Sequence, residues 1–521
     1  MKKFFVNIRK KYNSLDVYSR GIIILFFIIL VIRIALGIIH HPAGDSCWHI
    51  EVAEFFGKYK KMSLFEPVGR ELFTQPPLFH IIGGLLYSIF SIFSQEAGEM
   101  SIKLINPILG SVSVLLIFLI AKKLFNSKIG FYSALIFSFT PINIYFGYMS
   151  FVDETVAFFS ILSILFILYN NILLSSIFAG LAMLTKINGT FILVPVIYII
   201  WFINKSKKTR KFFHIFVLLF TAFIINFPWY LRNYIAIHNP VWPFLNFIFK
   251  SPYVSSDGGS QILFSNLTFL KKAATTLYLT YFGIPGGEIE QLSFFNIPFI
   301  ELLFIIWLFG TILFCIPLII GLIKLRDKKK AGLLIIWFGS FILLILLKMI
   351  TYNPVAHSRH ILPATPVIAI ISATGLIHIF KKNKIKIIAI MLLSFCIVGF
   401  VGVEFTKAIY SSIAWNRYSN DFEWIKNNIP QEKIIFAPGQ CFSYNFDRYT
   451  SQLWHDKSEW KKLGEGKARE KNISYLWVNQ EFTLDPMSIL PDDIFNNIKN
   501  SSLYELVYNN PETKTMIFKV K

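Results

Sequence analysis

Long apolar runs alternate with short polar segments along residues 21–403 of the chain. A helix that crosses the hydrocarbon core of a bilayer needs about 20 apolar residues, and about eleven of the runs come near this length. We expect spans at 21–39, 101–121, 129–148, 155–169, 172–185, 190–203, 212–227, 298–322, 331–349, 363–380 and 387–403. The pattern predicts an all-α polytopic membrane protein.

One further apolar run, 77–94, is predicted to lie at the membrane interface instead of crossing it. The run begins at Pro76–Pro77 and contains Gly83–Gly84, which weaken a helix interior. Counting it as a span would place the basic residues at 122–123 outside and invert every later loop. We therefore expect residues 75–94 to form a re-entrant or juxtamembrane helix.

The composition agrees with this class. Of the 521 residues, 55% are hydrophobic and 16% are charged, whereas soluble domains carry roughly 45–50% and 25%. These values exclude a soluble globular enzyme and a disordered chain. The 4 cysteines are too few for a fold built on disulfides.

The net charge of +21 is concentrated in short clusters between the apolar runs. These clusters lie at 1–20, 122–128, 205–211, 324–330 and 381–386, and the rest of the chain is neutral. A nucleic-acid binder would instead gather its basic groups on one folded surface. Cytoplasmic loops carry such clusters, so we expect a multi-pass plasma-membrane protein with a cytoplasmic N-terminus and no nucleic-acid partner.

The tail after the last span changes to a mixed polar composition. Strands are expected at 433–437, 473–478, 503–507 and 516–520, and helices at 421–428 and 492–498. We predict two domains, a transmembrane domain at 1–403 and a small extracytoplasmic α/β domain at 404–521. Three long segments fall outside in this topology: 40–75, 228–296 and the tail.

Residues able to carry chemistry gather on the predicted outer side. They are Asp45, His49, Glu51, Arg70, Asp153, Glu154, Lys186, Arg232, His357, Arg359 and His360. The early loops supply carboxylates and the later loops supply cations. A phosphorylated lipid substrate needs this combination, because cations hold the phosphate while a carboxylate serves the other reactant.

Several of these residues lie in short motifs that occur in order. The motifs are the acid Asp45 after the first span, Pro76-Pro77-Leu78, Asp153, Leu184-Thr185-Lys186, Pro228-Trp229-Tyr230-Leu231-Arg232-Asn233-Tyr234 with Asn239-Pro240 and Pro243, and Arg359-His360-Ile361-Leu362-Pro363. The set resembles the GT-C glycosyltransferases, in particular the protein O-mannosyltransferase and ArnT-like branch (glycosyltransferase family 39 or related). The resemblance covers residues 21–380.

This resemblance implies a GT-C fold and an inverting transfer of a hexose or pentose from a polyprenyl-phosphate donor, dolichyl or undecaprenyl, on the outer face. The acceptor hydroxyl would belong to a protein, a lipid or a glycan. Asp45 matches the catalytic acid and would act as general base, and Asp153 matches the second-loop acid. Lys186, Arg232, Arg359 and Arg70 would bind the donor phosphate.

The resemblance also leaves points open. Ser46 follows Asp45 where the branch commonly has a second acid, so a divalent metal on the first loop is an open question. Glu154, His49, His357 and His360 are candidates for acceptor or metal binding. The Trp-Trp-Asp acceptor motif of oligosaccharyltransferases is absent, which argues against transfer of a whole oligosaccharide.

Structural alternatives stand beside these roles. Asp45 and Asp153 have good residue types for helix caps, and Glu154 is expected to be the capping or solvent-exposed neighbour. His49 and Glu51 would share one side of an amphipathic helix with Asp45.

The same reasoning covers residues outside the motif set. Val52 would face lipid, and Arg33 would snorkel or pair near the outer end of its span. Cys47 and Cys441 are expected to be separate thiols, although both lie outside and could pair. The rival function is a transporter or flippase of a lipid-linked or anionic substrate, which would place charges at the bilayer midplane.

Overall fold

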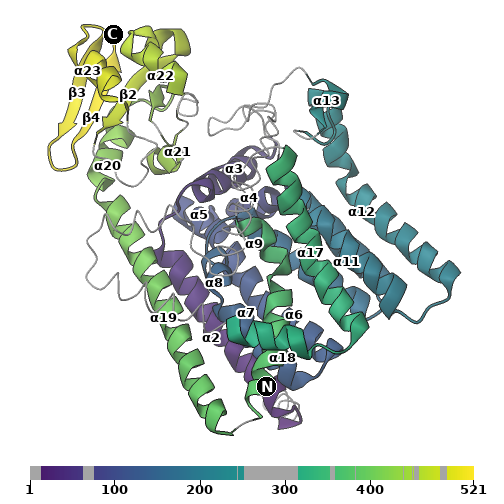
Figure 1. Ribbon diagram of the computed structural model, residues 1–521. Helices are drawn as coiled ribbons and strands as arrows, with labels where there is room; N and C mark the ends of the chain where they lie inside the picture. Colours follow the sequence, from purple (N-terminus) through teal and green to yellow (C-terminus); the bar gives the residue numbers. More distant parts are fainter. Residues whose placement is uncertain are drawn as a thin grey trace.

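The computed structural model is a bundle of helices with a small sheet domain beyond one end (Figure 1). It describes residues 13–62, 75–242, 245–251, 315–351, 358–381, 383–437, 439, 441–448, 450, 457–480 and 490–521. Arg70, His357 and most of the predicted span at 298–322 lie outside the described residues.

Five described helical segments are long and apolar enough to cross a membrane, in agreement with a multi-pass membrane protein. They are Val17–Ile39, Gln95–Leu124, Lys208–Ile237, Arg359–Ile379 and Lys386–Asn416. Shorter or partly described helices fill the bundle between them: α7 (Ser127–Phe139), α9 (Val152–Leu168), α10 (Ile172–Thr185), α11 (Leu193–Tyr198) and α17 (Lys328–Thr351). The predicted helical membrane fold is confirmed.

Two of the predicted spans are interrupted. The run at 129–148 becomes α7 and the short helix α8 (Pro141–Phe146), which meet at Thr140. Pro141 has no N–H to continue the α7 hydrogen bonds, so the chain restarts there with proline in the first helical turn. The run at 190–203 combines the 3₁₀ helix η1 (Ile187–Ile192), α11 and the π-helix η2 (Ile199–Ile203).

Two other helices run further than predicted. Helix α12 (Lys208–Ile237) continues through Pro228, where the sequence predicted the end of a span and the start of an outer segment. The membrane boundary itself stays a prediction. A proline removes one hydrogen bond, which a membrane-exposed helix can absorb where neighbouring groups compensate. Helix α19 (Asn383–Asn416) runs through the predicted domain boundary after residue 403. The division into domains there stays a prediction.

Three short helices lie across the end of the bundle that carries the sheet domain: α3 (Asp45–Tyr59), α4 (Leu78–Phe90) and α5 (Gln95–Lys103) (Figure 1). The 13 residues of α4 extend about 20 Å at 1.5 Å per residue. The placement of α4 at the membrane interface stays a prediction. Helices α3 and α4 approach so closely that a Cβ on Gly84 would lie 2.6 Å from the Ala53 carbonyl oxygen.

The sheet domain contains all four predicted strands: β1 (Ile434–Phe436), β2 (Ile473–Asn479), β3 (Tyr504–Asn510) and β4 (Thr515–Val520). Their order is β1-β2-β4-β3, with β1 parallel to β2 and the other pairs antiparallel. The predicted helices are present as α20 (Ser419–Asn428) and α23 (Asp492–Asn500). Side chains alternate across the sheet, so that Trp477 of β2 packs on one face and Leu476 on the other.

The sheet domain is fastened to the juxtamembrane helices. Cys47 of α3 and Cys441 of α21 (Cys441–Phe446) form a disulfide, so the expectation of separate thiols is wrong. Gln95 of α5 donates to Asp447 Oδ1 at 2.9 Å. The domain is thereby covalently linked to the helix that begins with Asp45.

Two buried charges inside the bundle also differ from the sequence expectation. Arg33 of α2 (Val17–Ile39) is 1% exposed and donates from Nη2 to the Asn143 carbonyl oxygen at 2.9 Å, so it points inward instead of snorkelling. Glu154 is 0% exposed, which makes the expected solvent-exposed position wrong. Gly110 and Gly147 line the Arg33 guanidinium, where any Cβ would collide with it.

Candidate active site

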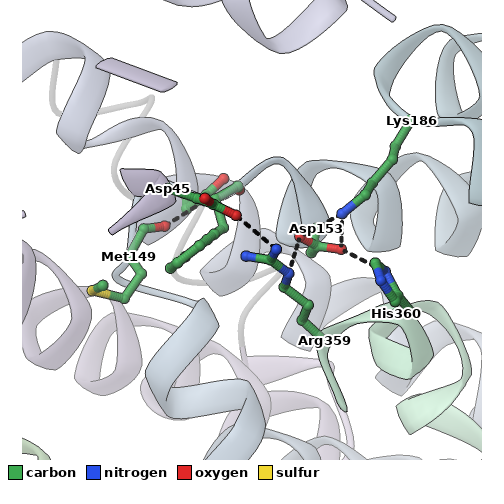
Figure 2. Close-up of polar contacts among 8 residues, drawn as sticks. Asp45, Met149, Asp153, Lys186, Arg359 and His360 are labelled. Atoms are coloured by element: carbon green, nitrogen blue, oxygen red, sulfur yellow. Dashed lines mark hydrogen bonds and ion pairs between the residues drawn. The ribbon is translucent and has the colours of Figure 1, made fainter. Parts of the chain in front are cut away.

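Five of the predicted site residues meet where the bundle approaches the sheet domain. Asp45 begins α3, and Asp153 lies in the first turn of α9. Lys186 is the residue at which α10 ends, while Arg359 and His360 lie in the 3₁₀ helix η3 (Ser358–Ala364). Figure 2 shows their side chains converging from these four elements.

Asp153 is the buried centre of the group. Its side chain is 1% exposed and accepts hydrogen bonds from Lys186 Nζ at 2.8 and 3.0 Å. The Lys186 side chain is itself only 10% exposed. His360 Nδ1 lies 3.8 Å from Asp153 Oδ1. A charge pair excluded from water in this way interacts more strongly than the same pair on the surface.

Arg359 joins Asp153 to Asp45. Its Nη2 donates to Asp45 Oδ2 at 2.7 Å, and its Nε lies 3.9 Å from Asp153 Oδ2. The guanidinium also lies over the Phe151 ring, 5.0 Å from the centroid. The Asp45 and Arg359 side chains are 22% and 17% exposed, so this end of the group faces outward while Asp153 is enclosed.

Neither carboxylate acts as the helix cap that the sequence left open as an alternative. The N-cap residue of α3 is Gly44 and that of α9 is Phe151, and neither makes a side-chain capping hydrogen bond. Asp45 and Asp153 instead lie inside the first turns, where a negative charge is favourable near the helix N-terminus. Their side chains are directed to the cations of η3 and α10.

The remaining candidates lie elsewhere. Glu154 is buried towards Arg33, and Glu51 lies among acidic groups that include Glu54 and Glu99. Glu51 therefore does not share the Asp45 side of α3. Arg232 donates to the Asn233 side chain at 2.7 Å and stacks on Trp229.

Two tryptophans connect α12 to α3. Trp229 of α12 packs with Trp48 and Val52 of α3. Val52 is consequently 3% exposed, and its predicted lipid-facing position is wrong.

His49 forms a buried pair that the sequence did not reveal. Its Nδ1 lies 3.0 Å from His80 Nε2 on α4. Burial lowers the pKa of His49 well below its usual value and that of His80 to about 3, so both rings are neutral. In the sequence His80 is a lone histidine in an apolar run, and only the crossing of α3 and α4 places it beside His49.

The site carboxylates do not form a metal centre in this arrangement. Asp45 and Asp153 are both occupied by cationic side chains. Among the described residues, no group of three or more His, Cys, Asp and Glu side chains could hold a metal ion. The predicted second-loop acid and first-loop acid are thus joined through Arg359 and not through shared ligation.

Comparisons with known proteins place this geometry in context. A family model described as dolichyl-phosphate-mannose-protein mannosyltransferase matches residues 74–231. The structure is similar to apo ArnT from Cupriavidus metallidurans, with a TM-score of 0.62 at 12% identity, covering 96% of this chain and 98% of that one. The GT-C glycosyltransferase fold is therefore the fold of this chain.

Other GT-C neighbours agree at similar distance. The Archaeoglobus fulgidus oligosaccharyltransferase has a TM-score of 0.59 at 12% identity, covering 95% of this chain and 73% of that chain. Mycobacterial arabinofuranosyltransferase AftD has a TM-score of 0.55 at 12% identity, covering 95% and 40%. No curated protein sequence matches the chain. The GT-C fold and the family-model match together support a membrane glycosyltransferase.

Proposed function

We propose that this protein transfers a sugar from a polyprenyl-phosphate donor to an acceptor hydroxyl at the extracytoplasmic membrane face, with inversion. The observation that carries the proposal is the series of ion pairs that joins Asp45, Arg359, Asp153 and Lys186 at the end of the bundle next to the sheet domain. One similar structure, ArnT from Cupriavidus metallidurans, was solved bound to undecaprenyl phosphate, with a TM-score of 0.60 at 13% identity.

Charge balance explains how such a donor would bind. Two carboxylates and two cations compensate each other in the group, so an incoming phosphodiester must replace one carboxylate as a partner of a cation. The Asp45–Arg359 contact is the more exposed one. The donor phosphate therefore takes Arg359 from Asp45, while Lys186 stays with the buried Asp153.

This exchange prepares Asp45 for catalysis. A carboxylate bound to a guanidinium is a weak base, because the cation favours its ionised form. Once Arg359 turns to the phosphate, the Asp45 carboxylate no longer pairs with that guanidinium and accepts the proton of the acceptor hydroxyl. Positioned proton transfer of this kind contributes roughly 10²–10⁴-fold to a rate.

The reaction is then a single displacement. The acceptor oxygen attacks the anomeric carbon of the sugar, its proton passes to Asp45, and the bond from the anomeric carbon to the phosphate oxygen breaks. The electron pair leaves with the polyprenyl phosphate. Arg359, in contact with the phosphate, stabilises its developing charge, and the Lys186 ammonium, still paired with Asp153, adds a positive charge nearby in a site of low dielectric. One displacement inverts the anomeric configuration.

The partners and the orientation belong to the same proposal. The acceptor is a hydroxyl of a protein, lipid or glycan, and the basic clusters place the N-terminus in the cytoplasm. The sheet domain, linked to α3 through Cys47, then stands outside the membrane above Asp45. No metal is assigned a step, because both acids have cationic partners.

Purified protein in proteoliposomes with radiolabelled polyprenyl-phosphate sugars tests the proposal. The expected result is label on a hydroxyl acceptor together with free polyprenyl phosphate. Movement of intact labelled donor between leaflets, without cleavage, would overturn the transferase and favour the transporter.

A further inference from the structure

A cavity lies away from the candidate active site, towards the end of the bundle where α18 (Thr365–Ile379) finishes. It has a volume of about 610 Å³ and is bounded by α7, α18, α19 and the Cys315–Lys324 helix. Its walls are almost entirely aliphatic, with residues such as Ile136, Pro317, Leu376 and Leu393. Lys381 and His378 lie at one end of this lining.

The walls are held in place by backbone packing. A Cβ on Gly375 of α18 would collide with the Pro317 carbonyl oxygen, and one on Gly321 would collide with the carbonyl oxygen of Ile371. The two glycines thus allow the Cys315–Lys324 helix to rest directly on α18. The cavity is therefore present before any ligand binds.

Apolar side chains on two walls also face outward. Ile316, Ile388 and Leu392 line the cavity and remain 47%, 58% and 38% exposed. In a membrane this exposure is to lipid, so the cavity opens sideways to the acyl chains. Water does not fill an apolar space of this kind, and a hydrocarbon chain does.

The cavity is short enough along α18 to lie within one leaflet of the bilayer. Ser372 and Ile379, both in the lining, are seven positions apart, or about 10 Å along α18 at 1.5 Å per residue. Half of a hydrocarbon core of about 30 Å is about 15 Å. The lining therefore begins near one membrane surface, at Lys381, and ends inside that leaflet.

The positive charge of Lys381 at this end of the cavity favours a lipid with an anionic headgroup. Lys381 is exposed and opens the basic cluster at 381–386. Basic pockets between membrane helices on the cytoplasmic side bind anionic lipid headgroups. We propose that this cavity binds an anionic glycerophospholipid of the cytoplasmic leaflet, with an acyl chain between α18 and α19 and the phosphate at Lys381.

The tail of the sugar donor is a less suitable occupant. Arg359 precedes α18, and the cavity rim lies at its other end, about 21 Å away for the 14 steps from Thr365 to Ile379. The donor phosphate is needed at Arg359, so it cannot also neutralise Lys381. An anion at the rim would therefore be a second molecule, distinct from the donor phosphate at Arg359.

Native mass spectrometry of the full-length protein tests this site without using sugar transfer. The detergent-purified protein is incubated with equal amounts of phosphatidylglycerol and phosphatidylcholine that carry the same acyl chains. We expect retained phosphatidylglycerol to exceed phosphatidylcholine about fivefold, the effect of one basic side chain near an anionic headgroup. Lys381→Glu should abolish the preference, and Ala389→Phe, which fills the cavity, should lower retention of both lipids.

Lys386→Glu is the matched control, because it makes the same charge change in the same cluster at a position outside the cavity lining. It should keep the preference. The proposal is wrong if both lipids are retained equally, or if the 381 and 386 variants behave alike. It is also wrong if added polyprenyl phosphate displaces the phosphatidylglycerol while a matched phosphatidylcholine does not. Size-exclusion profiles show whether each variant is folded.

Discussion

A double-mutant cycle at Asp153 and Lys186 measures how strongly these two buried charges stabilise each other. Asp153→Asn removes the negative charge but keeps the shape of the side chain, and leaves Lys186 Nζ buried without its partner at 2.8 Å. Removal of one member of a buried pair costs about 3–5 kcal/mol, because the other charge is left uncompensated. Lys186→Met leaves the buried Asp153 carboxylate without the Lys186 cation and should lower the free energy of unfolding by a similar amount.

The double variant Asp153→Asn/Lys186→Met removes both charges and stays balanced, since Asp45 and Arg359 still pair. We expect it to be more stable than the sum of the single variants predicts, by up to about 3 kcal/mol. Unfolding in mixed micelles with increasing dodecyl sulfate, followed by tryptophan fluorescence, gives the four free energies. The double variant should recover stability but not sugar transfer, because the positive charge of Lys186 beside the leaving phosphate is gone.

A surface pair provides the control. Lys467 Nζ and Glu465 Oε2 are also 2.8 Å apart, but their side chains are 47% and 43% exposed. Glu465→Gln should leave stability unchanged, because water screens exposed pairs. Additive single effects at Asp153 and Lys186, or changes as small as that of the control, would show that burial does not strengthen the Asp153–Lys186 pair.

Three further predictions concern the elements around the site. Cys47→Ser with Cys441→Ser should destabilise the protein by about 2–5 kcal/mol, since the disulfide closes a separation of 394 residues; unchanged protease resistance of the sheet domain would contradict this. Gly110→Ala should lower the free energy of unfolding by about 1–3 kcal/mol, because the new methyl group collides with the Arg33 guanidinium of α2. Its control Gly339→Ala, which meets nothing within 4 Å in α17, should be neutral or stabilising, and equal unfolding free energies for the two variants would contradict the packing. Burial beside other acids raises the pKa of Glu51 well above its usual value. The folded state therefore loses stability as the pH rises from the pKa of Glu51 in the unfolded chain towards its pKa in the folded protein. Glu51→Gln should therefore stabilise the protein at pH 8 and not at pH 4, and a pH-independent difference between the two proteins would contradict it.

The sequence predicted features that depend on local pattern. Apolar length and basic clusters located the helices, and strand-like stretches in the mixed polar tail located all four strands of the sheet domain. The order of the motifs predicted that Asp45, Asp153, Lys186 and Arg359 would meet, because each follows or precedes a helix that ends on the same side. Their convergence in one ion-paired group agrees with that prediction.

Features that depend on tertiary packing were not predictable in this way. The direction of Arg33 follows from the space left by Gly110, on another helix, and by Gly147, at the end of α8. The Cys47–Cys441 disulfide joins positions that only the docking of the sheet domain brings together. The continuation of α12 beyond its predicted end arises because Pro228 fits within a helix that has few close neighbours on its outward side.

The initial rate of sugar transfer by Asp45→Asn, measured in proteoliposomes with a donor that the wild-type protein uses, shows whether Asp45 is the general base. We predict a fall of about 10²–10⁴-fold, with donor binding retained because Arg359 and Lys186 remain. A rate close to that of the wild-type protein would show that Asp45 does not take the proton from the acceptor.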